Sequence, residues 1–216
     1  MASSVQTLRR TIEAHIERHL GTIKNVFRED AQDANETRIV HVAPSDTRPV
    51  HTLVTCGMSA RAMRVPKADQ PAHLELMMTL PREWQLEGEQ AQDERWSWPL
   101  RLLRQLAKRA HEDGGWLGWG HMIPNGDPPT PYARTTSLSV ALIVPSLLVP
   151  TPFYELKTAA KSIVFYAVVP LYKEEYELGR TSGTDTLFTR LIDGNVNDLV
   201  EPRRRNVARR RCWLFG

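Results

Sequence analysis

The stretch HTLVTCGMS at residues 51–59 predicts a β-strand that ends in a sharp turn. Residues 51–56 are rich in β-branched and apolar side chains, which are typical of strands. Gly57 follows directly, and glycine is the residue that most readily adopts the backbone angles of such a turn. The stretch matches no catalytic signature. It therefore indicates structural framework, and the segments on either side of it decide the fold class.

Further segments predict strands on both sides of this one. Residues 39–42, 137–144 and 162–169 are short apolar or β-branched runs. Residues 73–80 alternate, with three leucines and Met78 on one side and mostly polar residues on the other. We expect this last strand to bury one face and to expose the other to solvent.

Helices are predicted at both ends of the chain and in its centre. Apolar residues recur at spacings of three and four over residues 4–28, which indicates one amphipathic helix. Trp98-Pro99 is expected to open a central helix, because proline is tolerated in the first helical turn, and Gly114-Gly115 is expected to end it. Residues 174–178 predict a short helix or turn, and residues 184–193 predict another helix. Because strands outnumber crossover helices, we expect an α+β fold with a mixed, largely antiparallel β-sheet and helices packed on it.

The length and composition of the chain suit a globular domain with extensions. It has 216 residues, of which 41% are hydrophobic and 25% are charged, close to globular averages. We divide it into an N-terminal helix and loop at residues 1–34, a main domain at residues 35–195 and a basic tail at residues 196–216. No apolar run is long enough to span a bilayer and no secretory signal is visible, so we expect no membrane partner. Cys56 and Cys212 do not form a disulfide framework, and we expect a reducing, cytoplasmic location.

The positive charge is concentrated in the C-terminal tail. The net charge is +3, yet residues 201–211 alone contribute +5, so the rest of the chain is mildly acidic at −2. A mobile, solvated basic terminus is one interpretation, and contact with nucleic acid or an acidic protein is the other. The closing segment 212–215 is also able to dock on the domain. The arginines of the tail are Arg203, Arg204, Arg205, Arg209, Arg210 and Arg211.

The candidate catalytic and metal-binding residues each have a more ordinary structural interpretation. Ser59 lacks the flanking glycine of a nucleophile elbow, so we expect it to close a turn. Cys56 lies in an apolar strand, where cysteine usually acts as an inert hydrophobe. We predict no metal, no cofactor and no enzymatic activity. The histidines lack the ligand spacing of a metal site, whether on one helix, as His15 and His19, or on neighbouring strands, as His41, His51 and His73.

Aromatic residues gather around the central helix and the loop that follows it. Their tryptophans, at positions 96, 98, 116 and 119, either anchor the core or form a hot spot for a partner, where Trp and Tyr are enriched. Residues 124–132 form a proline-rich polar loop, which is a second candidate contact region. The candidate partner-binding residues are therefore Trp116, Trp119, His121, Asp127 and Tyr132.

The ordered motifs resemble the Suppressor of fused domain family over residues 35–195. The match depends on several short motifs in a fixed order, and on no single one of them. Residues 55–59 are similar to the family's strand ending in a Gly-x-Ser turn, residues 73–76 to its Phe/Val-Glu-Leu strand, Trp98-Pro99 and the leucines after it to its Trp-Pro helix, residues 119–121 to its aromatic, Gly and His segment, and residues 169–178 and 187–192 to its closing Glu-Glu-Leu and helix region.

The resemblance implies an α+β domain that binds proteins and has no known chemistry. Animal members carry a second domain and hold an extended peptide of a transcription factor between the two, and this chain is too short to contain both. It has Gly120 where the animal protein has an acidic residue before the histidine, so that peptide-binding mode does not carry over.

The stand-alone bacterial members, which this chain looks like, are thought to be immunity proteins that bind and neutralise polydomain toxins. The resemblance therefore predicts a non-enzymatic protein-binding domain, an immunity protein whose partner is a toxin or a regulatory protein. The alternative is a regulatory adaptor that uses its arginine-rich tail to contact nucleic acid or an acidic partner.

Overall fold

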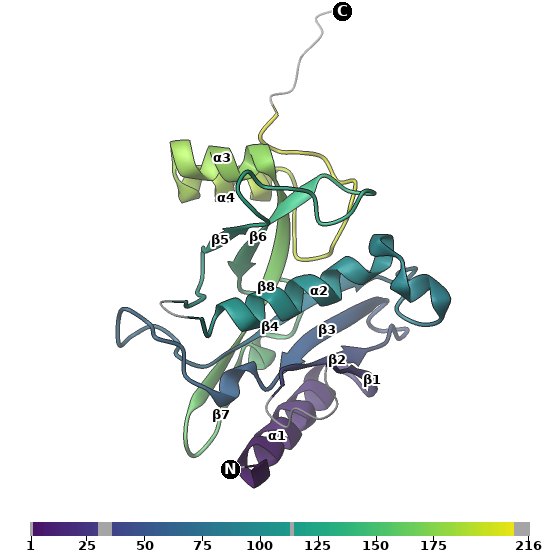
Figure 1. Ribbon diagram of the computed structural model, residues 1–216, viewed down its shortest axis with the longest axis vertical. Coiled ribbons are helices and arrows are strands. Elements are labelled where there is room, and N and C mark those ends of the chain that lie inside the picture. The colour runs from purple at the N-terminus through teal and green to yellow at the C-terminus, as the bar shows by residue number, and fades with distance from the viewer. Residues whose placement is uncertain (1, 30–35, 113–114, 210–216) are drawn as a thin grey trace, which may run out of the picture.

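The computed structural model describes residues 2–29, 36–112 and 115–209, which form helices around one β-sheet (Figure 1). The helices are α1 (Ala2–Leu20), α2 (Glu94–Arg109), α3 (Lys173–Ser182) and α4 (Thr184–Asp193). The strands are β1 (Ile23–Phe27), β2 (Arg38–Val42), β3 (Val50–Cys56), β4 (Leu74–Pro81), β5 (Met122–Pro124), β6 (Leu138–Val144), β7 (Glu155–Lys157) and β8 (Ser162–Tyr172). Short 3-10 helices cover Met58–Ala60, Glu89–Gln92 and Thr151–Phe153.

The strands form one mixed sheet in the order β1-β2-β3-β4-β8-β6-β5, with β7 paired to β8 beside this path. Strands β4 and β8 pair in parallel, and the other neighbours in this order pair antiparallel. The parallel pair joins an N-terminal meander to a C-terminal antiparallel group. The expected α+β fold with a largely antiparallel sheet is therefore confirmed.

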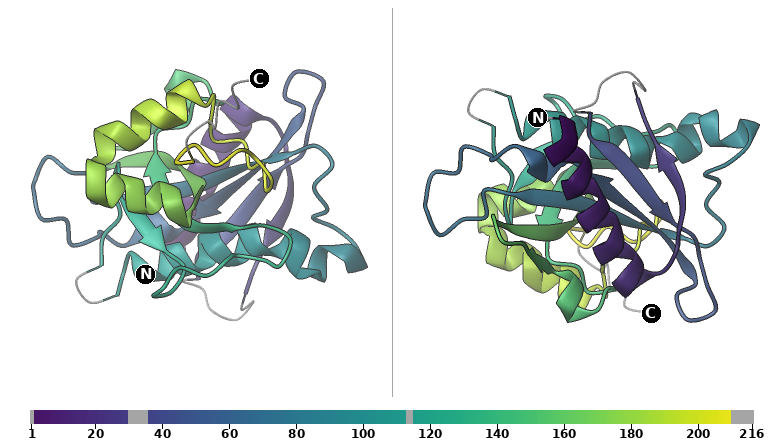
Figure 2. Two further views of the ribbon diagram at one scale, coloured as in Figure 1. Left: turned by 90° about the horizontal axis from the view of Figure 1, so that it is seen from above. Right: turned by 90° about the horizontal axis from the view of Figure 1, so that it is seen from below.

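Both faces of the sheet are covered, because the helices pack on it in two layers. The apolar side of α2 packs on one face against leucines of β3 and β4 and against β6 and β8. Helix α1 covers the opposite face over β2, β3 and β8, and α4 covers that same face over β6 and β8. In Figure 1 the α3–α4 pair lies at the top of the molecule, α2 in the middle and α1 at the bottom. Figure 2 shows the same layers from above and below.

The expectation that β4 exposes one face is wrong. Its residues from Leu74 to Leu80 are all buried, including Glu75, Met77 and Thr79 on the side expected to face solvent. Met77 packs in the cluster under α1, and the Thr79 carbonyl accepts a hydrogen bond from Val200. Alternation in the sequence shows the polarity of each face, but it does not reveal that a helix and a distant segment cover the polar one.

The expected helix over residues 4–28 is confirmed only as far as Leu20. Gly21 has a φ of +117°, and Ile23–Phe27 is the edge strand β1, paired antiparallel with β2. Ile23 and Phe27 continue the helical spacing of four, so the pattern alone did not separate strand from helix. The glycine marks the actual boundary.

The central helix begins earlier than Trp98-Pro99. It starts at Glu94, and the Asp93 carboxylate caps it by accepting a hydrogen bond from the Arg95 N–H at 2.8 Å. Pro99 therefore lies in the second helical turn. There it leaves the Arg95 carbonyl without its usual intrahelical donor.

Candidate partner-binding surface

The turn at residues 57–59 is held by a buried carboxylate. Gly57 has a φ of +115°, as its position after the strand predicted. The Glu75 carboxylate accepts hydrogen bonds from the Thr55 hydroxyl, the Gly57 and Ser59 N–H groups and the Ser59 hydroxyl, at 2.6 to 3.0 Å. Burial raises the pKa of Glu75, and the hydrogen bonds from Thr55 and Ser59 oppose that rise. Glu75 of β4 therefore holds the turn that follows β3 through buried hydrogen bonds.

Burial at this turn shields both candidate nucleophiles, Ser59 and Cys56, from solvent. The Ser59 side chain is fully buried and its hydroxyl donates to Glu75, so no substrate reaches it in this conformation. Cys56 is fully buried as well, and burial raises the pKa of its thiol well above the usual value. A protonated, buried thiol is a poor nucleophile.

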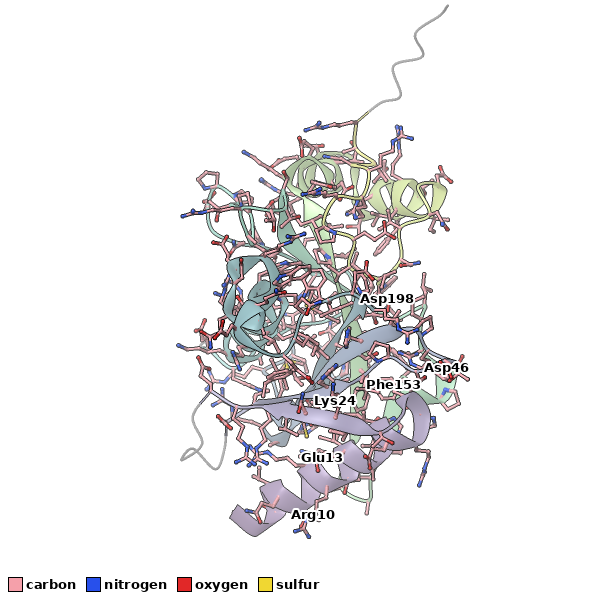
Figure 3. All side chains as sticks on the ribbon, turned by 90° about the vertical axis from the view of Figure 1, so that its right-hand side faces the viewer. Arg10, Glu13, Lys24, Asp46, Phe153 and Asp198 are labelled. Atoms are coloured by element: carbon pink, nitrogen blue, oxygen red, sulfur yellow. The ribbon has the colours of Figure 1, made fainter. Side chains whose placement is uncertain are left out.

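The histidines have structural partners. The ring of His15 packs between α1 and the sheet, with Nε2 3.1 Å from the Phe153 carbonyl oxygen and the ring stacked on Phe153, which Figure 3 labels. Nε2 of His41 lies 2.8 Å from Nδ1 of His51. Nδ1 of His73 lies 2.8 Å from the Ser59 carbonyl oxygen. Within the described ranges, no three His, Cys, Asp or Glu side chains are grouped to hold a metal ion.

The loop after α2 presents one exposed tryptophan. Trp116 is half-buried and meets the ring of His121 edge-to-face, with centroids 4.1 Å apart. Burial lowers the pKa of His121. Trp119 is 64% exposed, and one side of its ring stacks on Phe188 of α4 with centroids 5.9 Å apart. Gly120, between Trp119 and His121 in the sequence, has a φ of +80°. Trp116 and His121 thus lie together, whereas Trp119 points to the α4 side.

The other two candidate residues lie apart from this loop. Asp127 is exposed in the polar loop. Tyr132 is 7% exposed, and its ring stacks on Trp98 of α2 with centroids 5.4 Å apart. Burial raises the pKa of the Tyr132 hydroxyl. The Tyr132 ring is a core contact and is not open to a partner in this conformation.

Two residues of α4 extend the exposed aromatic surface, and the sequence reasoning did not identify them. Phe188 supports Trp119, and Ile192 is 74% exposed one helical turn further on. The predicted helix over 184–193 contained the signal, because burying Leu187 and Leu191 leaves positions 188 and 192 on another face. We call Trp119, Phe188 and Ile192 the aromatic patch.

The arginines of the tail differ in burial and in their partners. Arg204 forms a buried two-pronged ion pair with Glu175, in which the side chains are 8% and 0% exposed and the contacts are 2.6 and 2.7 Å long. The Glu175 carboxylate also accepts hydrogen bonds from the Val207 and Tyr172 N–H groups. The expectation of a mobile tail beyond Pro202 is therefore wrong for Arg204, because α3 supplies its counter-ion.

The other tail arginines differ in their surroundings. Arg209 pairs with Glu174 at 2.9 Å, and this contact lowers the pKa of Glu174. Arg203 and Arg205 are exposed. Arg210, Arg211 and the segment 212–215 lie outside the described residues.

The chain returns to the sheet before this tail. Asp198 accepts hydrogen bonds from the Ser146 hydroxyl and the Leu147 N–H, and it lies beside the strands in Figure 3. Leu199 then bridges in parallel to Thr79 of β4. We call residues 196–209 the C-terminal strap.

A family profile described as Suppressor of fused protein (SUFU) matches residues 33–205. The chain belongs to the Suppressor of fused family. No curated protein matches this SUFU-family chain.

Solved SUFU structures share its fold. A SUFU homologue from Neisseria gonorrhoeae FA 1090 superposes with a TM-score of 0.65 at 16% identity, covering 95% of this chain and 99% of that one. The Sufu–Fu complex gives a TM-score of 0.63 at 14% identity, with 94% and 91% covered. Drosophila Suppressor of Fused gives 0.55 at 15% identity, and the match covers 79% of this chain and 42% of that protein.

The SUFU motifs in this chain thus form a framework of buried carboxylates. Glu75 of the strand motif binds the Gly-x-Ser turn, and Glu175 of the closing motif binds Arg204. In the part of the chain that the structure describes, no helix has the length and apolar character needed to cross a membrane.

Proposed function

We propose that this chain is a non-enzymatic, cytoplasmic protein-binding domain that acts as an immunity protein by occluding a toxin. Family membership supports the binding part of the proposal, and so does the solved complex of Sufu with Fu. The gonococcal homologue, 99% of which is covered by the match, supports a binding unit of this size within the family. The burial of Ser59 and Cys56 supports the absence of catalysis.

The observation that carries the proposal is the aromatic patch. Trp119 and Ile192 are among the large hydrophobic side chains that remain exposed, and Phe188 holds the Trp119 ring in place. An ordered, exposed tryptophan offers a large contact area at a small entropic cost, and tryptophan is enriched at binding hot spots. Half-buried Trp116 and His121, with exposed Asp127, are proposed to lie at the edge of the same contact surface.

Co-expression with a neighbouring toxin gene tests the proposal. We expect the wild-type chain to rescue growth and to co-purify with the toxin. If the neighbouring gene product is harmless and no partner is retained from the source cell, the immunity function is wrong.

A matched pair of variants tests the patch itself. Trp119→Ala is expected to weaken binding by about tenfold or more, because truncating a hot-spot aromatic typically costs at least 2 kcal/mol. Val26→Ala is the control, because Val26 is an exposed apolar side chain on β1, at the opposite edge of the sheet from β5 and β6. If both variants bind the partner equally well, the aromatic patch is not part of the interface.

The second candidate is the regulatory adaptor that contacts nucleic acid through its tail. Exposed Arg203 and Arg205 favour it, whereas the burial of Arg204 against Glu175 weakens it. It predicts DNA or RNA binding that falls steeply with salt and disappears when residues 203–211 are removed. Binding that is absent or insensitive to salt contradicts it.

A further inference from the structure

A cavity of about 1080 Å³ lies between α3, the start of β6 and the C-terminal strap. One side of α3 lines it with Glu174, Glu177, Leu178 and Thr181, which recur at helical spacing. Pro129 and Pro131 of the polar loop form a second wall, and strap residues from Arg204 to Arg209 form the third. The strap runs beside the helices at this end of the molecule (Figure 2, left).

The charges around this cavity do not cancel. Each acidic side chain near it already has a cation: Glu174 has Arg209, Glu175 has Arg204, and Glu177 has Arg180. Lys173 and Arg205 also line the cavity, and both are exposed. Among the described residues, neither has an acidic partner within ion-pair distance. Among the described residues, the cavity therefore has two positive charges without an acidic partner.

A buried serine hydroxyl lies beside the cavity. Ser139 is 2% exposed, and its Oγ has no hydrogen-bond partner among the described residues. It lies where the β6–β8 register shifts, between Leu138 and Val140, and such an irregularity redirects a side chain. Ser139 lines the cavity, and a change of its side-chain rotamer would bring the buried Oγ to an acceptor oxygen of a ligand there, which would pair a hydroxyl that has no hydrogen-bond partner among the described residues.

We infer that this cavity binds carboxylate side chains from an acidic segment of a partner protein. The inference rests on the protein-binding function proposed above and assigns it a second contact site. Two free cations and a hydroxyl suit one or two carboxylates, while the prolines and Leu178 suit the methylene groups of a glutamate. Nucleic acid fits less well, because its affinity depends on many phosphate contacts spread along a surface.

The experiment uses the full chain and a hexaglutamate peptide, with binding followed by NMR chemical-shift changes. We expect the shifted amide signals to come from α3, Ser139 and the strap. Lys173→Gln combined with Arg205→Gln is expected to weaken binding about tenfold or more. The matched control is Lys67→Gln combined with Arg10→Gln, which removes the same exposed charges elsewhere and leaves the affinity unchanged.

The further outcomes each decide the question. Ser139→Ala is expected to fold normally, because the Ser139 hydroxyl has no hydrogen-bond partner to lose among the described residues, and to bind hexaglutamate more weakly, because a donor to the carboxylate is removed. Equal binding of hexaglutamate and hexaglutamine overturns the inference, as does an unchanged affinity in the double variant. Tighter binding of a dodecathymidine strand at the same residues overturns it in favour of nucleic acid.

The failure of this inference is distinguishable from failure of the proposed function. If the partner depends on Trp119 but hexaglutamate does not bind, only the cavity assignment fails. If hexaglutamate binds as expected but no partner protein is retained, the proposed function fails and the carboxylate site stands.

Discussion

At the scale of the single residue, Glu75 is a buried carboxylate that stabilises the fold. It is fully buried and holds four hydrogen bonds from the turn and from β3. Glu75→Gln places an amide N–H₂ against these donors, so we expect the free energy of unfolding to fall by about 2–4 kcal/mol. Urea denaturation measures it. Glu83→Gln, on an exposed side chain, is the control and is expected to change it by less than about 0.5 kcal/mol. Similar values for the two variants contradict the role of Glu75.

The His41–His51 pair makes stability depend on pH. Burial, followed by the charge of His51 and then that of Lys24, lowers the pKa of His41 from 6.5 to about 4, and Glu87 opposes this. Nδ1 of His41 is buried and has no hydrogen-bond partner among the described residues, so nothing receives an added proton. Because the pKa of His41 is lower in the folded state than in the unfolded state, folding favours the neutral ring. The contribution of neutral His41 to the free energy of unfolding is complete above pH 6.5 and is lost as the pH falls towards 4.

The loss attributable to His41 between pH 7 and 5 is about 1–2 kcal/mol. Urea denaturation of His41→Gln and of the wild type at both pH values isolates it, because the other histidines with lowered pKa values remain in both. A His41→Gln variant that loses as much stability as the wild type contradicts the assignment.

At the scale of the element, the sequence correctly predicted the segments in which the hydrophobic spacing and the flanking turn residues indicate the same boundaries. The 184–193 helix is confirmed at both ends, since Gly183 and Gly194 flank its apolar stripe. Strand β1 was missed because Ile23 and Phe27 fit both periodicities. The cover over the second face of β4 was missed because it comes from α1 and the strap, which no local pattern reveals. Trp119 was among the candidates, but its support by Phe188 depends on a tertiary contact.

The buried Arg204–Glu175 ion pair is one of the contacts that attach the C-terminal strap, beside those of Asp198 and Arg209. Among the described residues, Arg204→Gln leaves the fully buried Glu175 carboxylate with the Val207 and Tyr172 N–H groups as its donors, so we expect the free energy of unfolding in urea to fall by about 2–3 kcal/mol. Adding Glu175→Gln to that variant should restore part of the loss, because the unpaired charge is removed. Arg203→Gln, an exposed neighbour, is the control. A strap that is only loosely attached would give the same small change for Arg203 and Arg204.

At the scale of the whole molecule, the two proposed contact sites lie at the same end. The aromatic patch is built on α4, and the cavity is built on α3, while α1 lies at the opposite end of the long axis (Figure 1). A standard interface buries about 800 Å² on each partner, and we expect one partner to contact both sites. Hydrogen exchange on the complex with a co-purified partner should therefore show protection at residues 116–121 and 173–193. The control segment is α1, whose exchange should be the same in the free and bound chain, and slower exchange in α1 alone would place the interface at the other end.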